Sequence, residues 1–250
     1  MSKNHQETLE QEHQPEAIAL RLRQQPKTQN ISDAILGAID GCVTTFAIVS
    51  GAIGAGFSAS VALILGFANL LADGFSMAVS NYEANKAQSE FIDKVRKTEE
   101  EHIKKVPEGE REEIRQIFQR KGFEGETLEK IVATITQNTN LWIDTMLMEE
   151  HGIQPQNPSA IKAAITTFTA FVLVGAVPLI PFLITDTSID QQFITSAILA
   201  SIMFFMIGMF KSIIFARPIF ISGLSTLLTG STAAGLAFLT GYILREQFGL

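Results

Sequence analysis

Residues 35–83 read ILGAIDGCVTTFAIVSGAIGAGFSASVALILGFANLLADGFSMAVSNYE and decide the fold. Two apolar runs, neither with a lysine or arginine, are joined here by the glycine-rich turn Gly51–Gly56. Each run is close to the ~20 residues that an α-helix needs to cross ~30 Å of hydrocarbon. Because the turn is short and uncharged, the sequence predicts an antiparallel transmembrane hairpin.

Charge is distributed very unevenly along the chain, although 46% of the 250 residues are hydrophobic and 18% are charged. The charged residues gather in 1–32 and 83–158, whereas 34–82 and 160–244 are almost free of them. We therefore expect an all-α, multi-pass membrane protein in four parts. These are a disordered or loosely helical tail over 1–32, membrane helices over 33–82, a water-exposed helical insert over 83–158 and further membrane helices over 159–250.

The overall balance of charge excludes some partners. A net charge of −7 argues against a nucleic-acid partner, because phosphate binding depends on clustered lysine and arginine. Cations are the expected ligands instead. The single cysteine, Cys42, allows neither an intramolecular disulfide nor a cysteine-based zinc site, and we expect it to be a packing residue.

Breaker residues and apolar runs place the remaining helices. The insert is expected to contain three helices, over 83–105, 108–121 and 126–151, and the first of them continues the second membrane helix. Three more membrane spans are expected after it, over 160–185, 191–214 and 219–243. Pro178 and Pro181 can kink the third span if neighbours satisfy the freed carbonyls. Small residues in the last span allow close helix approach, within the chain or between two copies. The positive-inside rule puts the tail, the insert and the loop between Lys211 and Arg217 on the cytoplasmic side.

Polar residues interrupt the hairpin in a regular pattern. Asn69, Asp73, Met77 and Asn81 are spaced by four and share one face of the second helix. Asp40 lies at a similar distance from the turn as Asp73, so the hairpin brings both to a similar depth. A carboxylate at the bilayer centre costs roughly 2.5 to 3.5 kcal/mol, which favours a functional role. The alternative is interhelical hydrogen bonding that only holds the bundle together.

These donors indicate which cation the hairpin would carry. Two carboxylates, a thioether and amide oxygens suit Fe(II) or Mn(II) better than magnesium or calcium. The same carboxylates, with their pKa values raised by burial, could hold protons when no metal is bound. The hairpin therefore offers a route to exchange of metal for protons, and no separate cofactor is expected.

The insert carries a second set of candidate metal ligands. Each of its three expected helices offers two at helical spacing, and the set is Glu99 with His102, Glu110 with Glu113, and Met146 with Glu150. Together they would make one metal cluster. The alternative is that these acidic runs are solvated helix faces.

Two motifs give a resemblance to a known family. Residues 33–46, DAILGAIDGCVTTF, and 72–78, ADGFSMA, resemble the vacuolar iron transporter family of divalent-metal/proton antiporters. The resemblance covers about 33–245, with five membrane helices and a cytoplasmic insert after the second. It implies a transporter rather than an enzyme, which moves Fe(II) or Mn(II) out of the cytoplasm in exchange for protons. It also implies that the protein is a homodimer. It also assigns the membrane path to Asp40 and Met77, and metal binding in the insert to Glu99, Glu110, Glu113, Met146 and Glu150.

The sequence departs from the family pattern at two positions. His102 and Asn81 stand where many members have carboxylates.

Two other functions are possible for such a chain: a membrane-anchored metal sensor or storage protein, and a scaffold whose charged helices bind a protein. Neither uses the carboxylates inside the hairpin. The membrane itself, a bacterial cell membrane or a vacuolar one, stays open.

Overall fold

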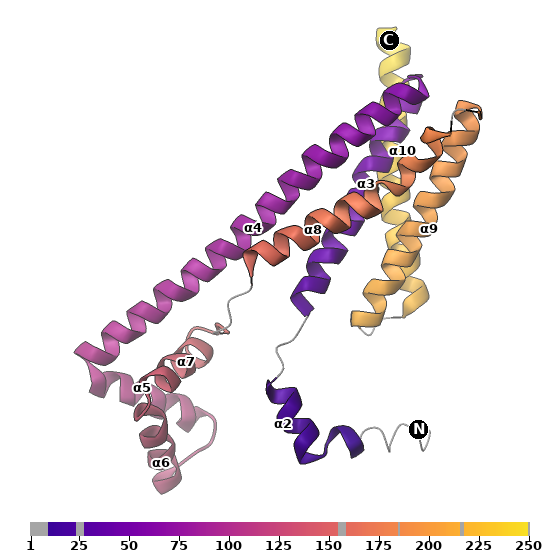
Figure 1. Ribbon diagram of the computed structural model, residues 1–250. Helices are drawn as coiled ribbons and strands as arrows, with labels where there is room; N and C mark the ends of the chain where they lie inside the picture. Colours follow the sequence, from indigo (N-terminus) through magenta and orange to yellow (C-terminus); the bar gives the residue numbers. More distant parts are fainter. Residues whose placement is uncertain (1–9, 24–27, 155–158, 185, 216–217, 250) are drawn as a thin grey trace. The chain divides into compact units, whose positions relative to one another are not determined.

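The computed structural model describes residues 10–23, 28–154, 159–184, 186–215 and 218–249, and no strand occurs in these ranges. Figure 1 shows the helices in chain order. Their bounds are α2 Pro15–Arg23, α3 Thr28–Gly54, α4 Ala59–Lys105, α5 Pro107–Arg120, α6 Gly125–Thr136, α7 Thr139–Glu149, α8 Ala160–Gly175, the 3-10 helix η1 Val177–Leu183, α9 Ile189–Phe215 and α10 Ile219–Phe248. The all-α prediction is confirmed, and the tail contains a short helix, α2.

The predicted hairpin is formed by α3 and α4. Gly56 joins them with a φ of +77°, a left-handed conformation that costs glycine little. Four of the described helices are long and apolar enough to cross a membrane: α3, α4, α9 and α10. The pair α8 and η1 makes a fifth span if the two are counted as one broken crossing.

The break between α8 and η1 lies at the prolines that predicted it. The two helices are bent by 40°, and both Pro178 and Pro181 belong to η1. α9 donates to carbonyls at both ends of η1: Ser196 Oγ to that of Pro178 at 2.6 Å, and Gln192 Nε2 to that of Ile184 at 2.6 Å. The Ser196 bond satisfies a carbonyl for which Pro181, three residues on, has no N–H, and this is the condition under which a membrane helix tolerates proline.

The chain divides into two compact units by its internal contacts. The first unit combines two segments of the chain, Met1–Leu70 and Thr169–Leu250. In this unit α10 packs against both α3 and α9. The buried side chains of its core include Cys42, Phe46 and Phe204, which confirms Cys42 as a packing residue. A Cβ on Gly241 would collide with the backbone carbonyl of Gly51, so this glycine lets α10 approach α3 closely.

The second unit, Leu71–Phe168, contains the insert. α4 runs unbroken from Ala59 to Lys105, as expected. The single helix expected over 126–151 is wrong: the structure has two, α6 and α7. The Asn138 side chain caps α7 by accepting hydrogen bonds from the backbone N–H groups of Asn140 at 3.1 Å and Leu141 at 3.2 Å, which stabilises a new helix start.

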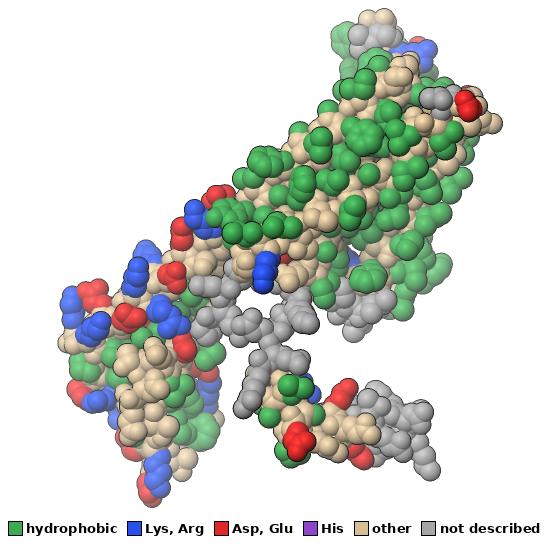
Figure 2. All heavy atoms as spheres, viewed as in Figure 1, with side chains coloured by type: hydrophobic (Ala, Val, Ile, Leu, Met, Phe, Trp, Pro, Cys, Tyr) green, Lys and Arg blue, Asp and Glu red, His purple; other side chains and the backbone are tan. Residues whose placement is uncertain are grey.

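Figure 2 shows the two kinds of surface that the charge pattern predicted. Hydrophobic side chains cover the membrane-length helices, whereas lysine, arginine, aspartate and glutamate crowd the end of α4 and α5 to α7. The insert has its own core, built around the fully buried Ile114 and Met146 and the nearly buried Trp142. Its acidic and basic residues therefore surround a packed centre.

Candidate metal centre

A first group of ligand atoms forms where α4 turns back into α5. Glu99 and His102 come from the last turns of α4, and Glu110 comes from the first turn of α5. One ligand atom from each of the three lies within 4.8 Å of the others. His102 Nδ1 is 3.4 Å from Glu110 Oε1. The structure thus brings together three of the six insert ligands predicted from sequence.

A second group uses Glu99 again, with Glu150 and His151. The Nε2 atom of His151 is 3.0 Å from Glu99 Oε1 and 3.5 Å from Glu150 Oε2. His151 is not among the ligands predicted from pairs at helical spacing. This histidine directly follows Glu150 at the end of α7, so it shares no helical spacing with another predicted ligand.

Negative charge accumulates in this region with little compensation. Burial, followed by the charges of Glu113 and Glu99, raises the pKa of Glu110 to about 7. Burial, followed by Glu150 and Glu99, also raises the pKa of Glu113. Such mutual repulsion is relieved by a proton or by a bound cation.

Two carboxylate oxygens in the centre are buried and lack a hydrogen-bond partner among the described residues. They are Oε2 of Glu99 and Oε2 of Glu110, and the two residues are 3% and 5% exposed. A buried polar group without a partner costs roughly 1 to 3 kcal/mol, and more when charged. Metal coordination would satisfy both atoms.

The other two predicted insert ligands lie outside these groups. Glu113 is exposed on α5, near enough for its charge to act on Glu110. Met146 is fully buried in the hydrophobic core of the insert, beside Ile114 and Trp142. Metal binding by these two residues stays a prediction.

The predicted membrane path is divided between the two units. Asp40 and Asn69 belong to the first unit, and Asp73, Met77 and Asn81 to the second, so the facing of Asp40 and Asp73 stays a prediction. Asp40 is half-buried, and the Asn69 Nδ2 atom is buried without a hydrogen-bond partner in the part of the chain that the structure describes. Asp73 is exposed on α4, and Met77 is half-buried.

Asn81 ends the polar stripe and is held by hydrogen bonds. Its Nδ2 donates to Thr167 Oγ1 of α8 at 2.7 Å, and its Oδ1 accepts from Asn85 Nδ2 at 2.8 Å. This amide thus links α4 to the start of the third predicted span.

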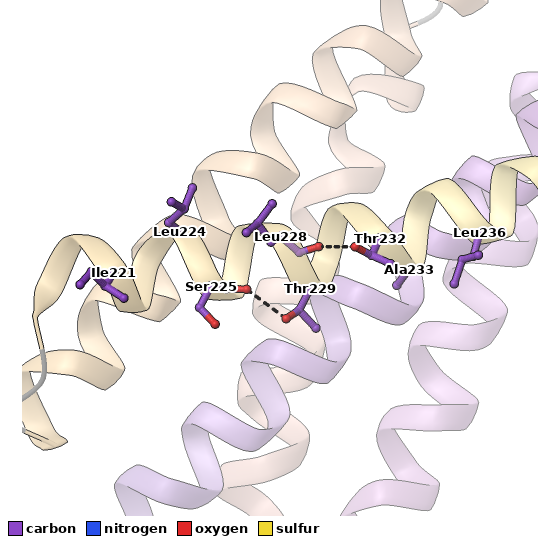
Figure 3. A pocket seen from close by; sticks show the side chains of 8 residues that line it. All are labelled: Ile221, Leu224, Ser225, Leu228, Thr229, Thr232, Ala233 and Leu236. Atoms are coloured by element: carbon purple, nitrogen blue, oxygen red, sulfur yellow. Dashed lines mark hydrogen bonds between the residues drawn. The ribbon is translucent and has the colours of Figure 1, made fainter.

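A groove along α10 offers a contrast to the metal centre. Figure 3 shows its lining, which consists of aliphatic and hydroxyl side chains: Ile221, Leu224, Ser225, Leu228, Thr229, Thr232, Ala233 and Leu236. Thr229 and Thr232 donate to the carbonyls of Ser225 and Leu228, one turn before each. No carboxylate, imidazole or thiol lines the groove, so it has none of the usual protein ligands for a divalent metal.

Comparison with known proteins identifies the family. Residues 31–242 match the model of the VIT family. A vacuolar iron transporter from Plasmodium berghei (strain Anka) is 31% identical over 229 residues, which cover 88% of this chain and 84% of the relative. Vacuolar iron transporter 1 from Eucalyptus grandis is 32% identical over 209 residues, covering 83% and 84%. The relatives are named as transporters, not enzymes, and the four or five membrane-length helices agree with an integral membrane protein. The resemblance seen in the sequence is confirmed, and the chain belongs to the VIT family.

Proposed function

We propose that this protein is a secondary transporter that exports Fe(II), and Mn(II) as a second cargo, from the cytoplasm in exchange for protons. The observation that carries the proposal is the pair of buried, unpartnered carboxylate oxygens on Glu99 and Glu110, beside the imidazole of His102. A site of this composition attracts a divalent cation. The relatives of this protein are named as iron transporters, which supports iron as that cation.

Capture and transport are proposed to use the same long helix. α4 carries Glu99 and His102 near its end, and Asp73 and Met77 in its membrane-length part. Metal gathered by the insert would be passed to a path made by Asp40, Asn69, Asp73, Met77 and Asn81. With the insert and the tail on the cytoplasmic side, the direction is outward, across a vacuolar or a bacterial cell membrane.

Protons would return through the same carboxylates. When the metal leaves Asp40 and Asp73, two negative charges remain in an apolar environment, where the charged form is penalised. Protons from the far side would neutralise them and be released to the cytoplasm when the next metal binds. This alternation couples one flux to the other.

A homodimer is proposed from the exposed face of α4. In the single chain, Asp73 is exposed beside Leu71 and Phe75, which are 59% and 66% exposed. A carboxylate facing lipid is costly, whereas a second copy would cover it and let it line an internal path. The face therefore supports assembly of two copies in the membrane.

The rival function is a membrane-anchored metal sensor or storage protein. The insert alone would serve it, and its membrane helices would need no carboxylates. Asp40 discriminates between the two functions, because an anchor gains nothing from it.

Metal uptake by proteoliposomes tests the proposal. Vesicles that contain the protein and have a lumen more acidic than the outside should accumulate Fe(II). Asp40→Asn keeps the shape of the side chain but removes its charge, and should lower the initial rate of Fe(II) uptake at least tenfold. The matched control is Asp190→Asn, at an exposed position in the first turn of α9, and should transport normally. Uptake by Asp40→Asn at the control rate would reject the path, and no Fe(II) or Mn(II) uptake by wild type would reject transport.

A further inference from the structure

We propose that α9 and α10 form a binding site for one anionic phospholipid. Its headgroup phosphate would occupy a polar cavity beside Lys211, and one acyl chain would lie in the groove along α10 that Figure 3 shows. The cavity has a volume of about 550 Å³, and its polar lining consists of Lys211, Ser212, Ser222, Ser225 and Thr226. Such a site adds a lipid ligand to a protein whose proposed cargo is a metal ion.

The cavity and the groove are continuous along one face of α10. Ile221 and Ser225 line both of them. From there the groove residues follow at helical spacing, through Leu228 and Thr232 to Leu236, so they form a single stripe. A polar compartment thus opens into an apolar one, which matches the two parts of a phospholipid.

The cavity lies where two membrane-length helices end. The candidate spans are Ile189–Ser212 and Ile219–Phe248, so Lys211 and Ser222 lie within one turn of the span ends. A lysine near the end of a membrane helix extends its ammonium group to the level of the lipid headgroups. By the positive-inside rule we expect this end on the cytoplasmic side, where the leaflet carries anionic lipids.

The cavity offers hydrogen-bond donors and a positive charge to a phosphate. No carboxylate lines it in the part of the chain that the structure describes, so the charge of Lys211 is not balanced within the cavity. Thr226 Oγ1 donates to the Ser222 carbonyl at 3.1 Å, and the hydroxyls of Ser222 and Ser225 can donate to a ligand. α10 begins here at Pro218 without a side-chain cap, so its first backbone N–H groups add positive potential. An ammonium group beside hydroxyls is a suitable donor set for phosphate oxygens.

The groove suits an acyl chain in its chemistry and in its length. Ile221, Leu228 and Leu236 are 66%, 59% and 63% exposed. The hydroxyls of Thr229 and Thr232 donate to carbonyls of their own helix, so they offer little to a polar partner. With a rise of about 1.5 Å per residue, the stretch from Ile221 to Leu236 is about 22 Å long. One leaflet contributes about half of the ~30 Å hydrocarbon core, so the groove can hold an acyl chain over its whole depth.

Close packing of α9 on α10 holds the cavity open and in place. A Cβ on Gly208 would lie 2.5 Å from the Ser222 carbonyl oxygen, so this glycine lets the two helices touch beside the cavity. The rings of Phe205 in α9 and Phe220 in α10 pack edge to face, with centroids 5.6 Å apart. The site is therefore formed before a lipid binds, which lowers the cost of binding.

Charge favours a lipid over a second copy of the chain in this groove. Two copies in a membrane run in the same direction, so pairing through α10 would bring two Lys211 side chains to the same level. Like charges that face each other across an interface weaken it. An anionic headgroup instead balances the lysine.

Native mass spectrometry of the purified full-length protein in detergent tests the site. The probes, added separately, are dioleoyl phosphatidylglycerol, dioleoyl phosphatidylcholine and inorganic phosphate. Wild type should bind the first phosphatidylglycerol at least fivefold more tightly than phosphatidylcholine, whose headgroup has no net charge, and far more tightly than inorganic phosphate. Lys211→Gln should remove the preference for phosphatidylglycerol. Lys162→Gln, at an exposed lysine in the first turn of α8, is the matched control and should retain it.

A second variant tests the groove apart from the lysine. Thr229→Phe fills the groove and should weaken the binding of both lipids at least fivefold. Thr195→Phe, at an exposed threonine of α9 that also donates to a carbonyl of its own helix, is the control and should bind them as wild type does. Equal binding of phosphatidylglycerol by Lys211→Gln, Thr229→Phe and their controls would reject the site.

Two further results would also overturn the lipid site. Inorganic phosphate bound as tightly as phosphatidylglycerol would identify a site for a free anion. Loss of a dimer in Thr229→Phe, with lipid binding unchanged, would assign the groove to a second copy of the chain. Each of these results would leave Fe(II) uptake by wild-type vesicles, and with it the proposed function, unaffected.

Discussion

The Nδ2 atom of Asn81 donates a 2.7 Å hydrogen bond to Thr167 Oγ1, across 86 positions of sequence. Thr167 is fully buried and Asn81 is half-buried, so this bond joins α4 to α8 at a site that is largely shielded from water. The family resemblance expects a carboxylate at position 81. The amide found there instead has a structural role, as a hydrogen-bond donor between two helices.

Removal of this bond should destabilise the protein. Asn81→Ala takes a donor from a buried hydroxyl, which costs about 1 to 2 kcal/mol. Thermal unfolding in a mild detergent should shift downward by several degrees. Gln88→Ala, at an exposed position two turns further along α4, is the control and should change little. An unfolding temperature of Asn81→Ala equal to that of the control would contradict the role of the bond.

Stability of the metal-free insert should fall as pH rises from about 4.5 to about 7. The raised pKa of Glu110, about 7 in the folded protein, means that the folded state keeps a proton that the unfolded chain has already released. The stabilisation is therefore present at the acidic end of this window and is lost through pH 7. Trp142 is the only tryptophan and is 3% exposed in the insert core, so its fluorescence reports this unfolding.

A variant isolates the carboxyl that causes this pH dependence. Glu110→Gln mimics the protonated form and should reduce the pH dependence in the presence of a chelator, leaving the smaller part that the raised pKa of Glu113 contributes. Glu90→Gln, at an exposed position, should retain the full dependence. An unchanged slope in Glu110→Gln would assign the effect to other groups. Bound metal should also reduce the slope, because it takes the place of the proton.

Ser196 should stabilise the broken third span. Its hydroxyl is fully buried and donates to the carbonyl of Pro178, so Ser196→Ala should cost about 1 to 3 kcal/mol. Ser201→Ala is the matched control, because Ser201 donates only to the Ala197 carbonyl of its own helix. Chemical denaturation in detergent measures both. Equal midpoints would show that η1 does not depend on this bond.

Two glycines of α10 should respond in opposite directions to alanine. Gly241→Ala places a methyl group against the backbone of Gly51, which cannot move without separating α10 from α3, and should cost several kcal/mol. Nothing lies within 4 Å of a Cβ at Gly235, so Gly235→Ala should gain up to about 1 kcal/mol from helix propensity. Thermal unfolding of the pair compares them directly, and equal shifts would contradict close packing at Gly241.

The hairpin and the kinked span could be predicted because each depends on local sequence. Apolar runs of membrane length without lysine or arginine, and the glycine turn between them, predict α3 and the start of α4. Pro178 and Pro181 predict the break before η1. The division of 126–151 into α6 and α7 was missed, because it depends on a cap at Asn138 inside an otherwise helical pattern.

The metal centre could be predicted only in part. Glu99, His102 and Glu110 lie near each other in sequence around one reversal, so helical spacing found them. His151 is 52 positions from Glu99 and reaches it because α7 packs back on α4. Spacing within one helix cannot reveal a contact of this kind. Met146 has helical spacing to Glu150 but lies in the core, where an apolar residue is equally favoured.

Coupling of metal to protons tests the central claim most directly. Vesicles with the insert outward, loaded with a pH-sensitive dye and without an imposed pH gradient, would receive Fe(II) on the outside. If metal is exchanged for protons, Fe(II) should enter while the lumen becomes alkaline, and vesicles with Asp40→Asn should show neither change. Entry of Fe(II) into wild-type vesicles without alkalinisation of the lumen would contradict it.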